Sequence, residues 1–583
     1  MRQVTDVSPM WMAGFTDVLS AHNAGWLLRR ARATLTGAAP GNALGPPPAS
    51  VKSAQTETVF LTVYANGQSA SYRGQAEGLL DATLQAVGGA AAGRLPAQRL
   101  QLDIVAGDAV PLMRPPAEGS KMEPLSQTAW QRLTSFQDGI VVAHGEQAYW
   151  LVVSQLLLQS MARARRDAEP ARPSNVLASA MRALGWQPDA WQDPAVELWS
   201  FQTTCWIEDA ALEQAIPMTQ GVIASASVGR GQMLASAVAG GEYLLRVQHD
   251  DGSFAYTVDP WLQTRSRNAY NIVRHSGTAA CLFELDAATG DPRFRAAALR
   301  AIEYQTRWYR PGDAPGHAYV LDRDGKAKLG ALGLALLALT RRLAAEADHT
   351  DREHALTLAR QIVAMQHPDG SFESYLPIKG TEPKGSVSLY YPGEAMLGLA
   401  RLAGLGLDDD GAFRAAAHRG ADFLIDSRRG KNRLPPDAWL MQALDVLYDD
   451  TPVPTYVEHA LAIGRSMLAD QYGERAPVAY AGSFGPEPIR STRTTARVEG
   501  LVSAYRLAAK AGDDRAPGLL AAMLRTVPHL LPLQYTSDNS YFLARPDLAL
   551  GGMRGGLDDA EIRIDYVQHH ISAMLGLASL VAG

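Results

Sequence analysis

The sequence has few of the features that mark secreted, membrane-bound or nucleic-acid-binding proteins. Its 583 residues include two cysteines, too few for a disulfide framework or a zinc cluster. The formal net charge of −6 at pH 7 gives no general reason to bind nucleic acid or an anionic membrane. No stretch reaches the roughly 18 apolar residues of a membrane span, and the start of the chain lacks the apolar core and cleavage site of a signal peptide. We therefore expect a cytoplasmic protein, and no motif predicts a cofactor or a metal site.

Length and sequence pattern predict two domains, because 583 residues are too many for one ordinary core. The stretch ETVFLTVYANGQSASYRG at 57–74 alternates in polarity and contains Asn66-Gly67, a hairpin signal. Further predicted elements are strands over 98–112 and 137–152 and a helix over 76–93. Together they predict an α+β domain over residues 1–212, followed by a linker over 213–228.

From residue 229 onward, helical periodicity replaces the strand patterns and forms a repeat. Each unit has an apolar helix rich in Ala, Gly and Leu, a short loop, and a more charged second helix that ends near a glutamine. One unpaired helix stands at each end, so twelve helices are expected, and pairing of the two end helices would close a ring. The pattern predicts an all-α (α/α)6 barrel, or toroid, over residues 229–583, with six inner helices inside six outer ones. The inner helices are expected to begin near residues 270, 328, 390, 437, 494 and 565, and the glutamines are Gln248, Gln305, Gln366, Gln471 and Gln534.

Polar residues recur at the start of the apolar helices. Inner helices of such a ring run parallel, so their N-terminal ends are expected to meet at one rim of a central cavity. Several of these residues are four apart and share a helix face, as Tyr390 and Glu394 do. The rim candidates are Tyr270, Asn271, Arg274, His275, Lys328, Tyr390, Tyr391, Glu394, Asp437, Trp439, Arg497, Glu499, Asp565, Gln568 and His569.

The rim candidates predict acid/base chemistry on a polar, acidic molecule. We expect Glu394, with Asp565 or Glu499, to exchange protons because burial raises the pKa of a carboxyl group, and Tyr390 or Tyr391 to assist. Two opposed carboxylates would permit glycoside hydrolysis. A tyrosine beside a histidine or a carboxylate would instead permit epimerisation or elimination next to a uronate carboxyl. For any single carboxylate, the helix dipole also explains an acid in the first turn. Substrate binding is expected from Tyr270, Asn271, Arg274, His275, Lys328, Asp437, Trp439, Arg497, Gln568 and His569.

Two short segments resemble a motif of α/α toroid proteins. QHDDGSF at 248–254 and QHPDGSF at 366–372 are similar to the Gln-x-x-Asp-Gly-Ser-Phe/Trp segments of terpenoid cyclases and six-hairpin glycosidases, where the motif stitches an outer helix to the following turn. The opening YYPGEA at 390–395 resembles those of carbohydrate-active toroids, including the glucuronyl epimerase group. The Asp-rich motif of terpene cyclases and the zinc ligands of lanthionine cyclases are missing. The likeness implies a toroid that acts on carbohydrate.

The N-terminal region resembles the AMMECR domain family over most of residues 20–212. Matching stretches include VFLTVYANGQ at 59–68, FQDGIVVAHGEQAYWLVV at 136–153 and LWSFQTTCWIED at 198–209. The family's Arg-Gly-Cys-Ile-Gly stretch is not kept, because this sequence reads ASYRGQ at 70–75, so chemistry at that cysteine does not carry over. The resemblance implies a binding or docking module through which a partner protein attaches.

The sequence as a whole predicts an enzyme that acts on an acidic sugar or polysaccharide as a glycoside hydrolase, lyase or uronate epimerase. A second hypothesis is a non-catalytic toroid that binds a polysaccharide or a protein in envelope or exopolysaccharide biosynthesis. A third hypothesis is a cyclase or transferase on a non-sugar substrate, which an apolar cavity would favour.

Overall fold

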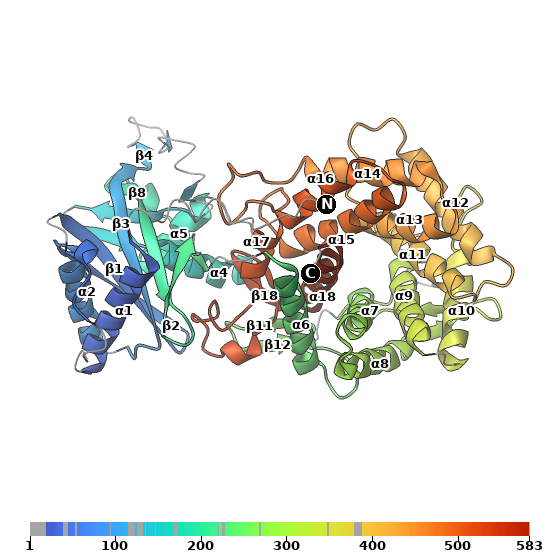
Figure 1. The fold of residues 1–583 in the computed structure, drawn as a ribbon, viewed down its shortest axis with the longest axis horizontal. Coiled ribbons are helices and arrows are strands. Elements are labelled where there is room, and N and C mark those ends of the chain that lie inside the picture. Colours follow the sequence, from blue (N-terminus) through green and yellow to red (C-terminus); the bar gives the residue numbers. More distant parts are fainter. Residues whose placement is uncertain are drawn as a thin grey trace.

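The protein consists of two units in the computed structural model (Figure 1): a sheet with helices, coloured blue to cyan, and a ring of helices, coloured green to red. No helix among the described residues combines the length and the apolar character needed to cross a membrane. The structure describes residues 19–38, 45–52, 55–93, 95–114, 123–124, 132–133, 136–145, 147–167, 173–219, 221–223, 228–266, 270–346, 349–377 and 388–581.

An antiparallel sheet forms the centre of the N-terminal unit. Strands β1 (Thr56–Ala65) and β2 (Gln68–Glu77) form the predicted hairpin. The two turn residues, Asn66 and Gly67, have φ angles of 49° and 78°, which is the backbone that a tight two-residue hairpin turn requires. Strand β3 (Arg99–Pro111) pairs with β1 and confirms the strand expected near residue 98.

A long strand, β8 (Val196–Glu208), organises the rest of the sheet. One edge of β8 pairs with β3, and the other edge pairs first with β6 (Gly139–His144) and then with β9 (Ala215–Thr219). Strand β7 (Gln147–Leu151) extends the sheet beyond β6, and β10 (Val222–Ile223) extends it beyond β9.

The segment 213–228 differs from the linker that the sequence predicts. It contains β9 and β10, so the sheet continues past residue 212. Strand β10 has two residues, too few to show alternation, and β9 reads AIPMT, which does not alternate in polarity and contains Pro217. Pairing with β8 holds them in the sheet instead.

Helices cover both faces of this sheet. Alternation along β3 turns Leu100, Leu102 and Ile104 toward α1 (Ala21–Thr36) and α2 (Leu79–Gly93), where they form one buried cluster. The opposite face carries α4 and α5, and its apolar cluster is continuous with that of the ring. The helices of that second face are α4 (Val153–Asp167) and α5 (Pro173–Ala183).

The inner helices of the second unit form a closed ring. Each packs against the next in chain order, and the last packs against the first, as the repeat predicts. Their side chains are buried almost all round, because each helix has neighbours on both sides and an outer helix behind it. In order around the ring they are α7 (Ile272–Thr289), α9 (Leu329–Ala345), α11 (Tyr391–Gly404), α13 (Ala438–Asp450), α15 (Ser491–Lys510) and α18 (Ile564–Leu580).

The outer helices complete the (α/α)6 toroid. The two helices that the sequence leaves unpaired, α6 at the front and α18 at the back, pack against each other and close the double ring. The outer helices are α6 (Arg230–Val247), α8 (Pro292–Thr306), α10 (His349–Ala364), α12 (Ala412–Ser427), α14 (Pro454–Leu468) and α16 (Ala516–Leu524) with α17 (Val527–Leu530).

Short strands connect the helices of the toroid. A small sheet has the order β12-β11-β18-β17, and β18 leads directly into α18. These strands are β11 (Thr257–Asp259), β12 (Thr264–Ser266), β17 (Arg554–Gly556) and β18 (Asp559–Arg563). Two-stranded ribbons pair β13 (Tyr309–Pro311) with β14 (Ala318–Val320), β15 (Ala327–Lys328) with β16 (Tyr375–Leu376), and, in the N-terminal unit, β4 (Met113–Arg114) with β5 (Glu123–Pro124).

Four of the five glutamines at the ends of the outer helices tie neighbouring outer helices together, whereas Gln305 donates to the Ala335 carbonyl of the inner helix α9. The Nε2 of Gln471 donates to the Gly482 carbonyl at 2.9 Å and to the Ala522 carbonyl of the next outer helix at 2.8 Å. The φ angle of Gly482 is 83°, and a Cβ there would lie 1.8 Å from the Arg525 carbonyl oxygen, so glycine is required. The structural role expected from the QHDDGSF-type segments is confirmed. The same pair of bonds is made by Gln248, Gln366 and Gln534.

A segment of the toroid, residues 534–553, packs against the sheet of the N-terminal unit. The ring of Tyr541 meets the ring of Tyr64 edge-on, with 4.7 Å between centroids. Arg99 of β3 donates to the Ser537 carbonyl at 3.2 Å. The units therefore join through both apolar and polar contacts.

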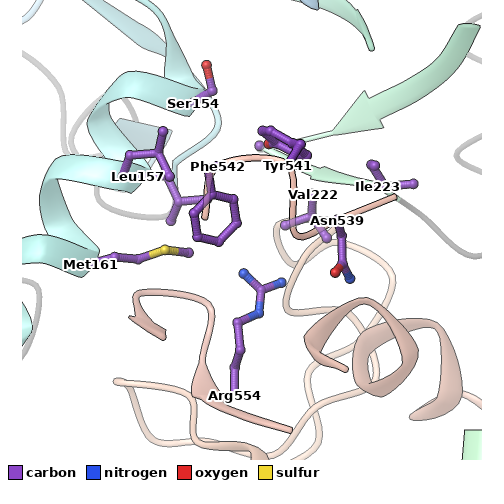
Figure 2. Close-up of a pocket in the computed structure, with 11 residues that line it drawn as sticks. Ser154, Leu157, Met161, Val222, Ile223, Asn539, Tyr541, Phe542 and Arg554 are labelled. Atoms are coloured by element: carbon purple, nitrogen blue, oxygen red, sulfur yellow. The ribbon is translucent and has the colours of Figure 1, made fainter. Parts of the chain in front are cut away.

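Figure 2 is a close-up view of this junction. Phe542 of the toroid segment lies between Leu157 and Met161 of α4 on one side and Arg554 on the other. The space left between them is about 10 Å³, room for about one water molecule. This part of the junction is closely packed.

Candidate active site

The first turns of the inner helices meet at one end of the ring, and several are fixed by local caps. Asn271 accepts hydrogen bonds from the backbone N–H groups of Val273 and Arg274 at the start of α7. Asp437 accepts from the Leu440 N–H at the start of α13. Asn271 and Asp437 are therefore used as helix caps.

Glu394, in the first turn of α11, is a buried carboxyl group without a strong partner. Its Oε2 has no hydrogen-bond partner within the described residues. Burial raises the pKa of Glu394 to about 8, Asp437 also raises it, and His569 acts in the opposite direction. A carboxyl with this pKa is protonated at neutral pH. It therefore carries a proton that it can donate.

A glycine on the neighbouring helix makes room for Glu394. A Cβ at Gly330 of α9 would lie 2.2 Å from Glu394 Oε2 and 2.4 Å from Tyr391 Cδ1. Both side chains therefore lie directly against the α9 backbone. Any larger residue at position 330 would displace them.

His569 and Glu499 form a hydrogen-bonded pair between α18 and α15. The Nδ1 of His569 lies 2.9 Å from Glu499 Oε1. Burial raises the pKa of Glu499, with a smaller opposing effect from His569. Burial alone would lower the pKa of His569, but the Glu499 carboxylate, with a further contribution from Asp565, outweighs it, so the net shift is upward. The pair can hold a proton more firmly than an isolated histidine.

Glu394 and the His569–Glu499 pair approach each other across the ring. Helices α11 and α18 are three places apart in the ring order, so they lie on opposite sides of its axis. The influence of His569 on the pKa of Glu394 therefore acts across the centre. The rings of Trp439 on α13 and His569 have centroids 6.2 Å apart. A proton donor and a basic pair thus share the centre of the rim.

Asp565 is held by two arginines. Its carboxylate lies 3.0 Å from Arg274 Nε and 2.5 Å from Arg563 Nε. Burial alone would raise the pKa of Asp565, but Arg563 and Arg274 together lower it below its ordinary value. Asp565 therefore stays ionised at neutral pH and is not suited to donate a proton. Two guanidinium groups around one carboxylate leave one positive charge in excess.

Aromatic and amide side chains border this group. The Tyr390 side chain is 43% exposed at the edge of the ring. Tyr391 is half-buried and meets the ring of Tyr375 edge-on at 6.1 Å. Gln568 is buried between α18 and α7, where a Cβ on Gly277 would lie 3.2 Å from its Oε1. These residues provide flat faces and hydrogen-bonding groups near the acid/base centre.

Tyr270 and His275 point away from the rim centre. His275 is fully buried, with Nδ1 2.7 Å from the Tyr270 hydroxyl and Nε2 2.8 Å from the Ala301 carbonyl of the outer helix α8. Burial lowers the pKa of His275 to about 4, so it is neutral. The Tyr270 hydroxyl also accepts from the Phe254 N–H. Both side chains connect an inner helix to an outer one.

Lys328 is also engaged within the protein. Its Nζ is paired with Asp322 and Asp324, each at 2.7 Å. These two ion pairs hold the buried ammonium group at the start of α9. The structure does not bring Lys328 into the central group.

Arg497 and Asp437 are likewise occupied. Arg497 lies over the Phe484 ring and donates to the Gly485 carbonyl. Asp437 is fully buried and pairs with Arg428 at 2.6 Å. Of the fifteen rim candidates, the structure therefore groups Glu394, Glu499, His569, Asp565, Arg274, Trp439, Gln568, Tyr390 and Tyr391.

Three residues of the site were not anticipated from the sequence. Arg563 pairs with Asp565 from the end of β18, and the Tyr256 hydroxyl accepts from Arg274. Gly330 provides the space for Glu394. Arg563 could have been identified from the sequence, because it is a basic residue two positions before the acidic Asp565. Tyr256 lies outside the helix openings, and Gly330, although it is in the first turn of α9, has no side chain that would mark it.

The arrangement suits proton transfer on a polar ligand. Within the described parts of the chain, no three His, Cys, Asp or Glu side chains converge as a metal site needs. The adjacent His569 and His570 diverge as helix geometry requires, because His570 Nε2 lies 2.7 Å from Ser236 Oγ of the outer helix α6.

Comparison with known proteins finds similarity in structure only. No family profile and no curated protein matches the chain. A family 76 glycoside hydrolase from a bovine Bacteroides thetaiotaomicron strain is 10% identical, covers 83% of this chain and 96% of its own, and has a TM-score of 0.47. Cellobiose 2-epimerase from Bacillus thermoamylovorans is 12% identical, covers 60% and 100%, and has a TM-score of 0.46. An unsaturated glucuronyl hydrolase specific for heparin is 15% identical, covers 60% and 98%, and has a TM-score of 0.43. Likeness at this level does not transfer an activity to this chain.

Proposed function

We propose that the toroid is a carbohydrate-active enzyme that acts on an acidic sugar or polysaccharide by acid/base catalysis. The observation that carries this proposal is Glu394: a buried carboxyl with a pKa of about 8 and a free oxygen, opposite a basic pair. Retaining a proton at neutral pH is what a general acid requires. Glu394 is therefore the proton donor.

The His569–Glu499 pair is the proton acceptor in this proposal. When Nδ1–H of His569 donates to Glu499, Nε2 is the nitrogen left to accept a proton. The Glu499 carboxylate then stabilises the imidazolium that forms. Glu394 and the pair together can deliver a proton to one side of a sugar and remove one from another.

The positive charge around Asp565 favours an acidic substrate. Arg274 is 37% exposed at its side chain, so its guanidinium is accessible while Arg563 holds Asp565. The N-terminal ends of the inner helices add positive potential at the same rim. A uronate carboxylate would be attracted to this point, with Asp565 keeping the guanidinium groups in position.

The aromatic side chains favour a sugar as the acidic molecule. Tyr390 and Tyr391 present flat faces beside the proton donor, and Trp439 does so beside His569. Such faces suit the apolar side of a pyranose ring. The resemblance of YYPGEA to the openings of carbohydrate-active toroids supports the same substrate class.

Incubation of the full chain with a panel of uronic-acid oligosaccharides in deuterated water tests this function. Mass spectrometry separates three reactions: hydrolysis adds water, elimination gives an unsaturated fragment, and epimerisation incorporates deuterium without cleavage. The Glu394→Gln variant is expected to lose turnover, and Glu303→Gln on the exposed face of α8 is the matched control. Saturable binding of an oligosaccharide without any product would favour the non-catalytic hypothesis.

We further propose that the N-terminal unit is an AMMECR-like binding module that includes β9 and β10 and so extends to residue 223, and that the toroid domain spans residues 229–583. The order of its strands and helices follows the stretches that resemble that family. Its sheet docks on the toroid through residues 534–553. A partner protein attached there would be held close to the enzyme. Two free, buried cysteines suit a reducing, cytoplasmic setting.

A further inference from the structure

A second cavity lies between the sheet of the N-terminal unit and the toroid, away from the rim. Its volume is about 140 Å³, and the toroid contributes Val478 to its wall. An engineered cavity of about 150 Å³ holds benzene, so this space accommodates a molecule of about four to six non-hydrogen atoms. The remaining lining residues are Gln101, Asp103, Arg132, Gln137, Val153, Ser154, Thr203, Cys205, Met218, Thr219 and Gly221.

The sheet face beneath this cavity is unusually polar. Alternation along β3 turns Gln101 and Asp103 toward the cavity, while their neighbours Leu100 and Leu102 face the apolar cluster under α1 and α2. Cys205 of β8 lies directly opposite Asp103 in the strand register. A face that only packed against another unit would carry apolar residues at these positions.

Within the part of the chain that the structure describes, the hydrogen-bond partners of Asp103 are neutral. Gln101 Nε2 donates to its Oδ2 at 2.7 Å, Thr203 Oγ1 donates to its Oδ1 at 3.2 Å, and the Cys205 thiol also donates to it. The carboxyl is 1% exposed, and burial raises its pKa to about 6. Near neutral pH it is thus a buried negative charge without a positive partner among these contacts. Such a charge is costly unless something compensates it.

Arg132, which also lines the cavity wall, is already paired. Arg132 lies 2.6 Å from Asp138, and those two charges balance each other. Thr219 adds a hydroxyl whose Oγ1 is buried without a partner in the described part of the chain. The wall therefore offers one uncompensated carboxylate and one free hydroxyl.

We propose that this cavity is a binding site for a small primary ammonium compound. The ligand's ammonium group supplies the missing positive charge to Asp103, and its remaining atoms occupy the space bordered by Thr219 and Val478. The site is separate from the toroid rim and does not depend on the carbohydrate activity.

The other titratable groups facing Asp103 do not compete for this role. Tyr64 from β1, Cys205 from β8 and Tyr541 from the toroid segment each have a pKa raised mainly by burial, so they are uncharged near neutral pH. Arg132 and Asp138 form their own pair. Ammonium binding is therefore expected to follow the ionisation of Asp103.

Isothermal titration calorimetry of the full chain with ethanolamine and with ethylene glycol tests the proposal. The two probes have the same number of non-hydrogen atoms and differ in one group, an ammonium against a hydroxyl. We expect saturable binding of ethanolamine at about pH 8, and binding about tenfold weaker at about pH 5, where most Asp103 is protonated. Ethylene glycol is expected not to bind.

Two variants separate binding from folding. Asp103→Asn removes the charge and is expected to weaken ethanolamine binding at least tenfold, whereas Asp108→Asn, at an exposed position of the same strand, is the control. Val478→Trp fills the cavity from an exposed position on the toroid side and is expected to abolish binding with Asp103 intact. Absence of ethanolamine binding to the wild type, equal binding of ethylene glycol, or retained affinity in either cavity variant would overturn the proposal.

Discussion

The raised pKa of Glu394 makes a prediction about stability that does not depend on knowing the substrate. The carboxyl has an ordinary pKa of 4.5 in the unfolded chain and about 8 in the folded protein. Between these values the unfolded chain has lost the proton and the native state retains it, so stability falls as pH rises. Each pKa unit corresponds to about 1.4 kcal/mol, so the full span corresponds to at most about 5 kcal/mol.

Glu394→Gln removes this dependence, because an amide does not titrate. Relative to wild type, the variant is expected to become more stable as pH rises from about 5 to about 8, by a difference of up to about 3.5 kcal/mol. Urea unfolding followed by the helical circular dichroism signal, repeated across this pH range, measures the difference. Glu303→Gln, exposed on α8, is expected to track the wild type throughout. A constant difference between Glu394→Gln and wild type across the range would refute the reasoning.

Two packing predictions follow from close approaches in the toroid. Gly330→Ala forces Glu394 and Tyr391 to move, so we expect a loss of about 1–3 kcal/mol in stability and a lower turnover number. Thermal unfolding and activity assays measure both effects. Gly404→Ala is the control, because an added Cβ there would contact no other residue. Gln471→Ala leaves the Gly482 and Ala522 carbonyls without their donor. We therefore expect the free energy of unfolding to fall by about 1–3 kcal/mol without a change in KM. Glu474→Ala in the exposed loop is its control, and an unchanged Tm in Gln471→Ala would contradict the stitching role.

The toroid was predictable because its signals are repeated. Apolar periodicity identified the inner helices to within three residues of their starts, and the recurring glutamines marked the ends of outer helices. Two unpaired helices implied closure, and α6 does pack on α18. Strands β9 and β10 were missed because β9 does not alternate in polarity and contains Pro217, and β10 has only two residues. Their place is set by pairing with β8, which no local pattern records.

The site was only partly predictable because spacing gives a shared face but not its direction. His275 and His569 both lie within the first two turns of inner helices, yet His275 bonds to the outer helix α8 while His569 bonds to Glu499 on the inner helix α15. Asp565 and Glu394 are both first-turn acids, and the positions of Arg563 and Arg274 beside Asp565 separate an ionised carboxylate from a protonated one. These distinctions arise from tertiary contacts.

The most direct test of the central claim is turnover of a uronic-acid oligosaccharide by wild type and Glu394→Gln, measured by mass spectrometry on protein whose fold is verified by circular dichroism. The proton-donor role predicts product from the wild type and a loss of at least about a hundredfold in kcat for the variant, the usual contribution of general acid catalysis. Full activity in a folded Glu394→Gln variant would contradict the account.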